Sequence, residues 1–200
     1  MYLFVKRLFD IVVSLLSLVI FSPVMLLIAI GVKWGDGGPV FFSQVRVGRG
    51  GKDFRIHKFR TMSDKRQTEP GLAVTAAGDS RITPLGARLR HWKFDELPQL
   101  WNILKGEMSF VGPRPEVPEM VELYSEEQRR VLEARPGMTD FATLEFRNEE
   151  TILAAEADPK KAYVEKIMPQ KIALSLRYLD ERSLVTDISL LCKTALAIVR

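Results

Sequence analysis

The order of hydrophobic and polar residues divides the chain into an apolar N-terminal stretch and a longer part of mixed polarity. Residues 11–32 contain no charged side chain, and a helix of this length can cross the hydrocarbon core of a bilayer. A secretory signal peptide is a poorer match, because its apolar run is shorter and ends in small residues at a cleavage site. The pattern therefore predicts a membrane-embedded helix followed by a domain that folds in water.

Two features of the apolar stretch favour a hairpin in one leaflet over a helix that spans the bilayer. Pro23 lacks the N–H that an intact helix requires, and the hydroxyl of Ser22 can bend the helix further by bonding to the backbone. Lys6 and Arg7 precede the stretch and more basic residues follow it, so the positive-inside rule draws both ends to the cytoplasm. Length alone favours a spanning helix, whereas the charges predict a re-entrant helix–break–helix hairpin over residues 1–34.

Beyond a break rich in glycine and proline at residues 35–39, the pattern predicts short elements, most of them helices. The predicted strands are 40–47 and 54–59, and the predicted helices are 83–91, 98–106, 118–134, 159–163, 169–178 and one that Thr186-Asp187 caps. Residues 65–78 are expected to form a loop, and residues 144–150 a short strand or loop. The expected fold is a helix-rich α/β domain over residues 35–200, with a few short strands and amphipathic helices that can lie on the bilayer surface.

The distribution of charge indicates an anionic partner. The whole chain has a net charge of +4, but residues 1–115 carry 17 Lys and Arg against 9 Asp and Glu, whereas residues 116–200 carry 12 against 16. A positive field beside a membrane segment favours phosphorylated ligands or acidic lipid. Nucleic acid is not expected as a partner, because no recognition motif accompanies the charge. Cys192 is the only cysteine, which excludes an internal disulfide.

The sharpest candidate for chemistry is the acidic pair Asp95-Glu96, which precedes Pro98 at the start of a predicted helix. Anionic groups are stabilised at such a position, so we expect both carboxyls to be ionised at neutral pH. An ionised carboxylate can attack phosphorus, and a neighbouring carboxylate can help to hold Mg²⁺ together with substrate phosphates. The alternative is that the pair only caps the helix.

Basic residues around this pair could bind phosphate. Lys58 and Arg60 would share one face of a strand and could clamp a diphosphate, although a solvated face or contact with acidic lipid would explain them equally well. Arg114 lies between two prolines that restrict its backbone, which suits bidentate phosphate binding but also fits an ordinary proline turn. Arg81 and Arg90 add further cations near the pair.

Taken together and in order, these segments resemble the bacterial sugar transferase family, the monotopic phosphoglycosyl transferases, in its minimal form. Any one segment would be weak evidence, but their common order is highly specific. The matching segments are KRLFDIVVSLLSLVIFSPV, GPVFFSQVRVG, FRIHKFRTM, GDSRITPLGARLR, DELPQLWNILKGEMSFVGPRPE and RPGMT, and they span nearly all of the first 140 residues.

The resemblance implies a membrane enzyme of glycoconjugate and polysaccharide synthesis. It implies a monotopic hairpin broken at Ser22-Pro23, on the cytoplasmic face of the bacterial inner membrane. The donor would be a UDP-sugar and the acceptor a polyprenyl phosphate such as undecaprenyl phosphate. Asp95 would be the nucleophile that forms a covalent phospho-sugar intermediate and releases UMP, with Glu96 beside it near Mg²⁺. Arg114 would bind phosphate.

The chain departs from the family pattern at two places, and two other functions remain open. His91-Trp92-Lys93-Phe94 replaces a stretch that usually resembles Lys-Thr-Ser-Leu, and residues 140–150 replace the usual Gly-Trp-Ala-Gln-Val-Asn-Gly-Arg. If the second segment lies over the sugar, the specificity for the sugar is what the departure affects. The alternative functions are a membrane anchor that binds acidic lipid without catalysis, and an enzyme that transfers the sugar alone and releases UDP.

Overall fold

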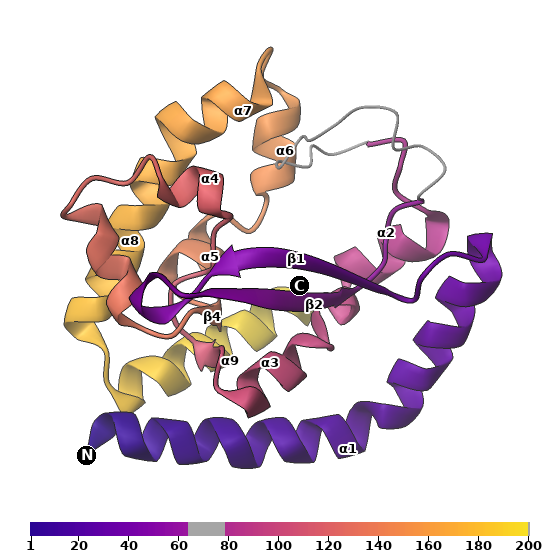
Figure 1. The fold of residues 1–200 in the computed structure, drawn as a ribbon, viewed down its shortest axis with the longest axis horizontal. Coiled ribbons are helices and arrows are strands. Elements are labelled where there is room, and N and C mark those ends of the chain that lie inside the picture. Colours follow the sequence, from indigo (N-terminus) through magenta and orange to yellow (C-terminus); the bar gives the residue numbers. More distant parts are fainter. Residues whose placement is uncertain (64–78, 200) are drawn as a thin grey trace.

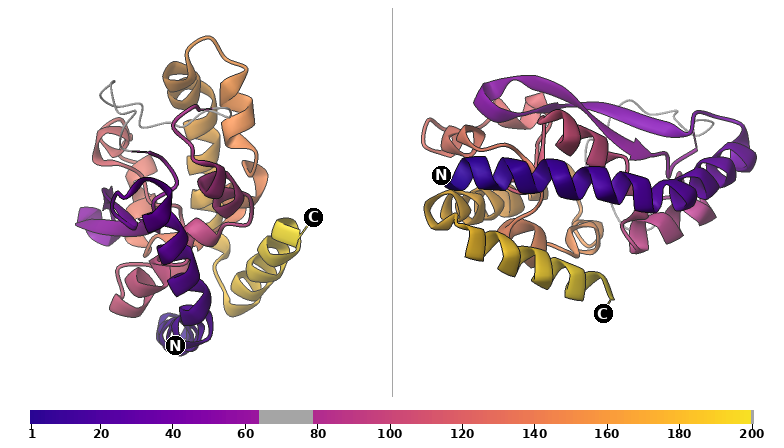
Figure 2. Two further views of the ribbon diagram at one scale, coloured as in Figure 1. Left: turned by 90° about the vertical axis from the view of Figure 1, so that its right-hand side faces the viewer. Right: turned by 90° about the horizontal axis from the view of Figure 1, so that it is seen from below.

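The computed structural model describes residues 1–63 and 79–199, and the loop expected at 65–78 lies outside them. The described residues form a helix-rich α/β fold with a few short strands, as predicted, and these strands make two small sheets (Figure 1). Helices α1 (Tyr2–Asp36) and α9 (Leu184–Val199) lie on the lower side of the molecule, below a long β-hairpin (Figures 1 and 2). The remaining helices pack beneath the hairpin, at both of its ends and around the second sheet (Figure 1).

Helix α1 is a single helix of 35 residues that contains Pro23, rather than two helices separated by a break. Its ribbon runs along the lower side of the molecule and then bends upward along one edge (Figure 1). The hydroxyl of Ser22 donates to the carbonyl of Val19 at 2.8 Å, and proline within a helix is a common cause of such a bend. The predicted interruption therefore takes the form of a bent helix in this structure.

The N-terminal part of α1 is attached to the domain by polar contacts. Lys6 Nζ lies 2.7 Å from a carboxylate oxygen of Asp187, at the start of α9. Arg7 donates to the carbonyls of residues 103 and 104 at 2.7 and 2.8 Å, where α3 (Gln99–Lys105) ends. The buried carboxylate of Asp10 accepts hydrogen bonds from the Ser109 hydroxyl and the Phe110 N–H.

The C-terminal part of α1 joins the hydrophobic core of the same domain. Ile28 and Val32 are buried in a cluster with Phe59 and Leu89. The outer surface of α1 remains apolar and exposed, as shown by Phe4, which is 75% exposed. A single helix, Tyr2–Gly35, is long and apolar enough to cross a membrane among the described residues.

Strands β1 (Phe41–Val47) and β2 (Asp53–Phe59) confirm the two predicted strands and pair as an antiparallel hairpin. The register places Phe41 opposite Phe59 and Val47 opposite Asp53. The connecting 3₁₀ turn η1 (Arg49–Gly51) contains two glycines with φ of 69° and 74°, a backbone conformation that other residues rarely adopt.

A second sheet, not predicted from the sequence, consists of the short parallel strands β3 (Ser109–Val111) and β4 (Gly137–Thr139). It holds together the FVGPRP and RPGMT segments. Gly112 donates to the Thr139 carbonyl at 2.9 Å, and a side-chain carbon at Gly137 would lie only 2.1 Å from the Gly112 nitrogen. These glycines therefore allow the two segments to approach at backbone distance.

Helices α2 (Pro84–His91) and α3 confirm the predictions for residues 83–91 and 98–106. Thr83 caps α2 by accepting from the Gly86 N–H, and Gly106 ends α3 with a φ of 89°. Gly86 packs so closely on the Thr61 carbonyl that a side-chain carbon there would lie 2.1 Å from the oxygen.

Local capping makes several predictions for the C-terminal part wrong. Residues 118–134 form two short helices, α4 (Pro118–Val121) and the 3₁₀ helix η4 (Gln128–Glu133), because Ser125 and Gln128 form a capping box that begins a new element. Residues 144–150 contain the end of α5 (Phe141–Glu145), which Asp140 caps, a turn at 146–148, and the start of α6 (Glu149–Ala154), so the predicted strand or loop is reduced to that turn. Ser183, rather than Thr186-Asp187, caps α9.

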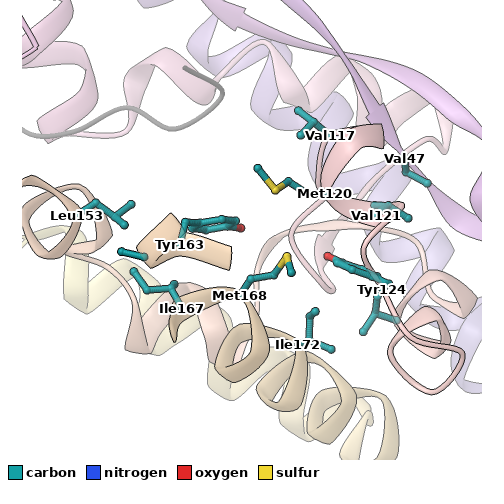
Figure 3. Close-up of a cluster of buried hydrophobic side chains, with 12 residues drawn as sticks. Val47, Val117, Met120, Val121, Tyr124, Leu153, Tyr163, Ile167, Met168 and Ile172 are labelled. Atoms are coloured by element: carbon teal, nitrogen blue, oxygen red, sulfur yellow. The ribbon is translucent and has the colours of Figure 1, made fainter. Parts of the chain in front are cut away.

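The main hydrophobic core lies between the hairpin turn and the C-terminal helices. Helix α7 (Pro159–Ala162) continues through a π-helical turn, η5 (Tyr163–Ile167), into α8 (Met168–Glu181), so residues 168–169 begin a helix without a break before it. Figure 3 shows this core, which combines the end of β1 with side chains from α4 and from the α6–α8 region. Its buried members are Val47, Val117, Met120, Val121, Tyr124, Val131, Leu153, Ala162, Tyr163, Ile167, Met168 and Ile172.

Candidate active site

The acidic pair lies in a short 3₁₀ turn, η3 (Phe94–Glu96), between α2 and α3. Lys93 enters this turn in the left-handed conformation with a φ of 57°, a backbone state uncommon outside glycine and associated with functional sites. Asp95 and Glu96 are only 7% and 6% exposed. Within the described part of the chain no side chain caps η3 or α3, so the pair is not a simple helix cap.

Glu96 is held by two cations from different elements. Its Oε1 lies 2.8 Å from Lys58 Nζ on β2 and 2.5 Å from a guanidinium nitrogen of Arg114, which follows β3. Burial would raise the pKa of Glu96, but these two cations outweigh it and hold the pKa well below its usual range. Glu96 therefore carries a firmly ionised carboxylate that positions Lys58 and Arg114.

Asp95 has a different environment from its neighbour. Its Oδ1 is buried and has no hydrogen-bond partner among residues 1–63 and 79–199. Burial raises the pKa of Asp95, against the opposing effect of the Lys58 cation, while the negative charge of Glu96 raises it further. A poorly solvated, more basic carboxylate is a better nucleophile than one whose charge is fully paired.

The backbone on both sides of Arg114 is fixed. The Pro113 carbonyl accepts from the Gly137 N–H at 2.9 Å, and the Pro115 carbonyl accepts from Arg46 at 3.1 Å. The neighbouring Glu96 raises the pKa of Arg114 above its usual range. A charged guanidinium on a rigid backbone, with about a third of its side chain exposed, can bind phosphate without reorganising.

The other predicted phosphate-binding residues make different contacts. Arg90 donates to the Thr61 hydroxyl and pairs with Glu150, both at 3.0 Å, and its charge lowers the pKa of Asp95. Arg60 follows the last residue of β2 and donates to the carbonyls of residues 39 and 62, at the junction between α1 and the domain. Arg81 pairs with Asp79 at 2.6 Å. The structure thus brings Lys58 and Arg114 to the acidic pair, but gives Arg60 and Arg81 other partners.

Sequence reasoning did not identify a group of polar residues on the far side of Arg114. They come from one loop and three helical elements, α6, η5 and α8, and the only local signal is that one of them directly follows the Pro-Arg-Pro motif. The group consists of Glu116, Glu149, Tyr163, Lys171 and Ser175.

The acidic pair fits a magnesium ion, although the described residues contain no cluster of three or more Asp, Glu, His or Cys side chains. Mg²⁺ is commonly bound through one or two carboxylates, with water and substrate phosphates as the remaining ligands. The buried, unpartnered Oδ1 of Asp95 is an oxygen of the required kind, and Glu96 supplies a second carboxylate beside it.

Comparison with known proteins matches the chain to a family of sugar transferases. The family model described as bacterial sugar transferase matches residues 1–200. The chain is 38% identical over 189 residues to the uncharacterized sugar transferase EpsL of Bacillus subtilis, covering 94% of this chain and 84% of EpsL.

Two further relatives carry more specific names. One is the UDP-glucose:undecaprenyl-phosphate glucose-1-phosphate transferase of Caulobacter vibrioides, which is 36% identical over 94% of this chain and 67% of that protein. The other is the UDP-N-acetylgalactosamine-undecaprenyl-phosphate N-acetylgalactosaminephosphotransferase of Aeromonas hydrophila, 36% identical over 96% of this chain. The matched region is only 43% of that longer protein.

Proposed function

The chain belongs to the bacterial sugar transferase family, and we propose that it transfers a sugar 1-phosphate from a UDP-sugar to a polyprenyl phosphate, such as undecaprenyl phosphate. The observation that carries the proposal is the contrast within the acidic pair. Asp95 has a buried oxygen without a partner, whereas Glu96 is bound by Lys58 and Arg114. One carboxylate is free to react, and the other organises cations for a phosphate.

In the first step the Asp95 carboxylate attacks the phosphorus that carries the sugar. A bond forms between Asp95 and phosphorus, the bond to the bridging oxygen of the diphosphate breaks, and its electron pair leaves on UMP. Arg114 and Lys58 stabilise the negative charge that develops on the phosphoryl oxygens. Glu96 keeps both cations in place during this step.

In the second step the phosphate of the polyprenyl acceptor attacks the same phosphorus. The bond to Asp95 breaks, its electron pair returns to the carboxylate, and the sugar remains joined to the lipid through a diphosphate. Asp95 is thereby regenerated. The covalent intermediate carries one phosphate instead of the diphosphate of the donor, so the lipid phosphate meets less negative charge than it would in direct attack on the donor.

Asp95 and Glu96 would hold Mg²⁺ together with oxygens of the donor diphosphate. When bound, the ion supplies charge neutralisation and makes UMP a better leaving group. The residues of this chain then have separate tasks. Arg114 orients the phosphate, and Glu96 fixes the cations around it.

The contacts of α1 support a monotopic arrangement on the cytoplasmic face of the bacterial inner membrane. Lys6 and Asp10 near one end, and Val32 near the other, contact the same domain. Two ends of a helix that both touch one domain lie on the same side of a bilayer. The exposed apolar surface of α1 would then enter one leaflet, as residues 1–34, and the domain of residues 35–200 would remain in the cytoplasm.

Helix α9 supports the same orientation. It lies on the lower side of the molecule with α1, and its outer surface includes Val185, which is 78% exposed, and Leu196, which is 61% exposed (Figure 2). An amphipathic helix with this pattern can lie in the interface of the bilayer. A site at the membrane surface could receive a soluble donor and a lipid acceptor.

The identity of the released nucleotide tests the proposal against the alternatives. The full chain in lipid nanodiscs is incubated with a UDP-sugar, Mg²⁺ and undecaprenyl phosphate, and the nucleotide products are separated by chromatography. We expect UMP. Release of UDP would show that the sugar alone is transferred. Release of neither nucleotide would favour the alternative function, a membrane anchor without catalysis.

A further inference from the structure

A pocket beside Arg114 is lined by charged and hydroxyl side chains that the proposed chemistry does not use. Its walls include Glu116, Tyr163, Lys171 and Ser175, together with Arg114 itself. In Figure 3 the hydroxyl of Tyr163 points toward the interior of the surrounding cluster, where Tyr124 lies on the opposite side. A polar wall within a hydrophobic core is expensive unless its groups are paired or bind a ligand.

The polar groups of this wall form one network around Lys171, which is 9% exposed. Its Nζ lies 2.8 Å from Glu149 Oε2 and 3.2 Å from the Tyr163 hydroxyl, while Glu116 is 3.6 Å away. Tyr163 donates its hydroxyl hydrogen to Glu116, and burial together with Glu116 raises the pKa of the phenol, so it remains a donor. An ammonium group has three N–H bonds. Within the described chain, Glu149 and the Tyr163 hydroxyl accept from two of them, which leaves one N–H of Lys171 to donate to a ligand.

Residues 149 and 150 connect this network to the catalytic residues. Glu149 binds Lys171 and acts electrostatically on Arg114, raising its pKa. Glu150 binds Arg90, whose charge acts on Asp95. Two adjacent glutamates thus pair with cations of two different elements, Lys171 on α8 and Arg90 on α2. Both glutamates lie at the end of the segment 140–150.

From these contacts we infer that Glu149 and Lys171 bind the hydroxyl or acetamido groups of the donor sugar and determine which sugar is accepted. The inference rests on the proposed function, in which the sugar is attached to the phosphorus that Arg114 and Asp95 contact. The sugar is therefore the part of the donor that lies next to that phosphate. A carboxylate accepts hydrogen bonds from sugar hydroxyls, and an ammonium group donates to hydroxyl or carbonyl oxygens.

The pocket has room for a group about the size of a water molecule, such as one hydroxyl, and its charge argues against a phosphate there. Glu116 and Glu149 would repel a second phosphate, whereas a neutral sugar lets both carboxylates keep their present partners. A site that bonds a substrate hydroxyl rejects an analogue lacking it, because buried polar groups then lose their partner. The network thus has the chemistry needed to distinguish sugars that differ at one hydroxyl.

Binding of UDP-sugar and of UDP, measured separately, tests the inference without turnover. In the background of Asp95→Asn, the dissociation constants of UDP-glucose, UDP-galactose and their two N-acetyl derivatives are measured by calorimetry with Mg²⁺, and UDP serves as the ligand without a sugar. Glu149→Gln and Lys171→Met are each expected to raise the dissociation constant of the tightest-binding UDP-sugar roughly tenfold. The dissociation constant of UDP should not change. The matched control is Glu156→Gln, which removes one partner of the exposed Lys166–Glu156 pair and should change neither constant.

Equal weakening of UDP and UDP-sugar would overturn the inference, because it would indicate a structural role, and so would unchanged binding of both. The proposed function has a separate criterion. If the unmodified chain releases no UMP while the sugar-dependent loss of binding is observed, the sugar site stands and the chemistry proposed for Asp95 is wrong.

Discussion

Asp95 and Glu96 are adjacent in the chain and both buried, but their surroundings shift their proton affinities in opposite directions. Two cations share one oxygen of Glu96, whereas an oxygen of Asp95 has no partner in the described chain. Environments that separate the pKa values of neighbouring carboxyls are typical of sites where the two groups have different roles. This contrast supports the proposed division of the pair into a reactive group, Asp95, and a positioning group, Glu96.

Replacing the reactive carboxylate tests this division. Asp95→Asn preserves the shape of the side chain but removes the charged nucleophile, so we expect UMP release to fall by roughly 10³-fold or more. Turnover is measured by nucleotide release, and folding is checked by circular dichroism. Near-normal turnover in the folded variant would remove Asp95 from the role of nucleophile.

The same substitution should stabilise the fold at neutral pH. The pKa of Asp95 lies above its ordinary value of 3.8 in the folded chain, so ionisation there costs more than in the unfolded chain. That cost is absent below the ordinary pKa and complete above the folded pKa. We therefore expect Asp95→Asn to raise the unfolding temperature by about 2–4 °C at pH 8, which corresponds to roughly 1 kcal/mol, and the gain to shrink as pH is lowered.

Thermal unfolding at several pH values, with wild type and variant in the same nanodiscs, measures this difference. Because all other carboxyl groups are common to both proteins, their contributions cancel in the comparison. A variant that is less stable than wild type at pH 8 would show that the Asp95 carboxylate is favourably solvated.

Among the elements, α1 provides a test of membrane topology, that is, whether this helix enters one leaflet or spans the bilayer. The Ser22→Leu/Pro23→Leu double variant restores a backbone donor and adds apolar surface, so the helix should straighten and span the bilayer. Single cysteines are placed at Phe4 and at Gly35 in a Cys192→Ser background and treated with an impermeant thiol reagent on intact cells. In the parent helix neither cysteine should react, whereas in the double variant the cysteine at position 4 should react from outside. Reaction at position 4 in the parent would show that its α1 already spans the bilayer, and would contradict the proposed hairpin.

The elements also show how far sequence pattern can predict this fold. Alternating apolar residues identified β1 and β2, and Thr83 and Gly106 marked the limits of two helices, because these signals are local. Strands β3 and β4 have three residues each and pair across more than twenty intervening positions, so no local period reveals them.

The site was predictable to the extent that its residue types were distinctive. The acidic pair and the Pro-Arg-Pro arginine were identified from the sequence, and the structure places them together with Lys58. Arg60 was grouped with Lys58 by strand alternation, but β2 ends at Phe59, so the two side chains have different partners. Lys171 on α8 has no distinctive neighbours in sequence, and only tertiary packing brings it near Arg114.

For the whole molecule, the proposed covalent intermediate predicts an order of events. Donor cleavage should not require the lipid, so the chain with UDP-sugar and Mg²⁺ alone should release up to one equivalent of UMP and gain the mass of a phospho-sugar. Steady-state kinetics should be ping-pong, with parallel double-reciprocal lines. Intersecting lines, together with no UMP and no mass gain in the absence of lipid, would indicate direct transfer. Asp95 would then serve as a metal ligand only, and not as the nucleophile.

The buried carboxylate of Asp10 has a consequence for the biosynthesis of the chain. Its two partners, Ser109 and Phe110, follow it by 99 and 100 positions. A ribosome adds about 5 to 20 residues per second, so roughly 5 to 20 s pass before these partners exist. During that interval the Asp10 carboxylate lacks both of the partners that β3 supplies in the folded chain. The contacts that fix this part of α1 to β3 therefore form only after about 100 further residues have been made.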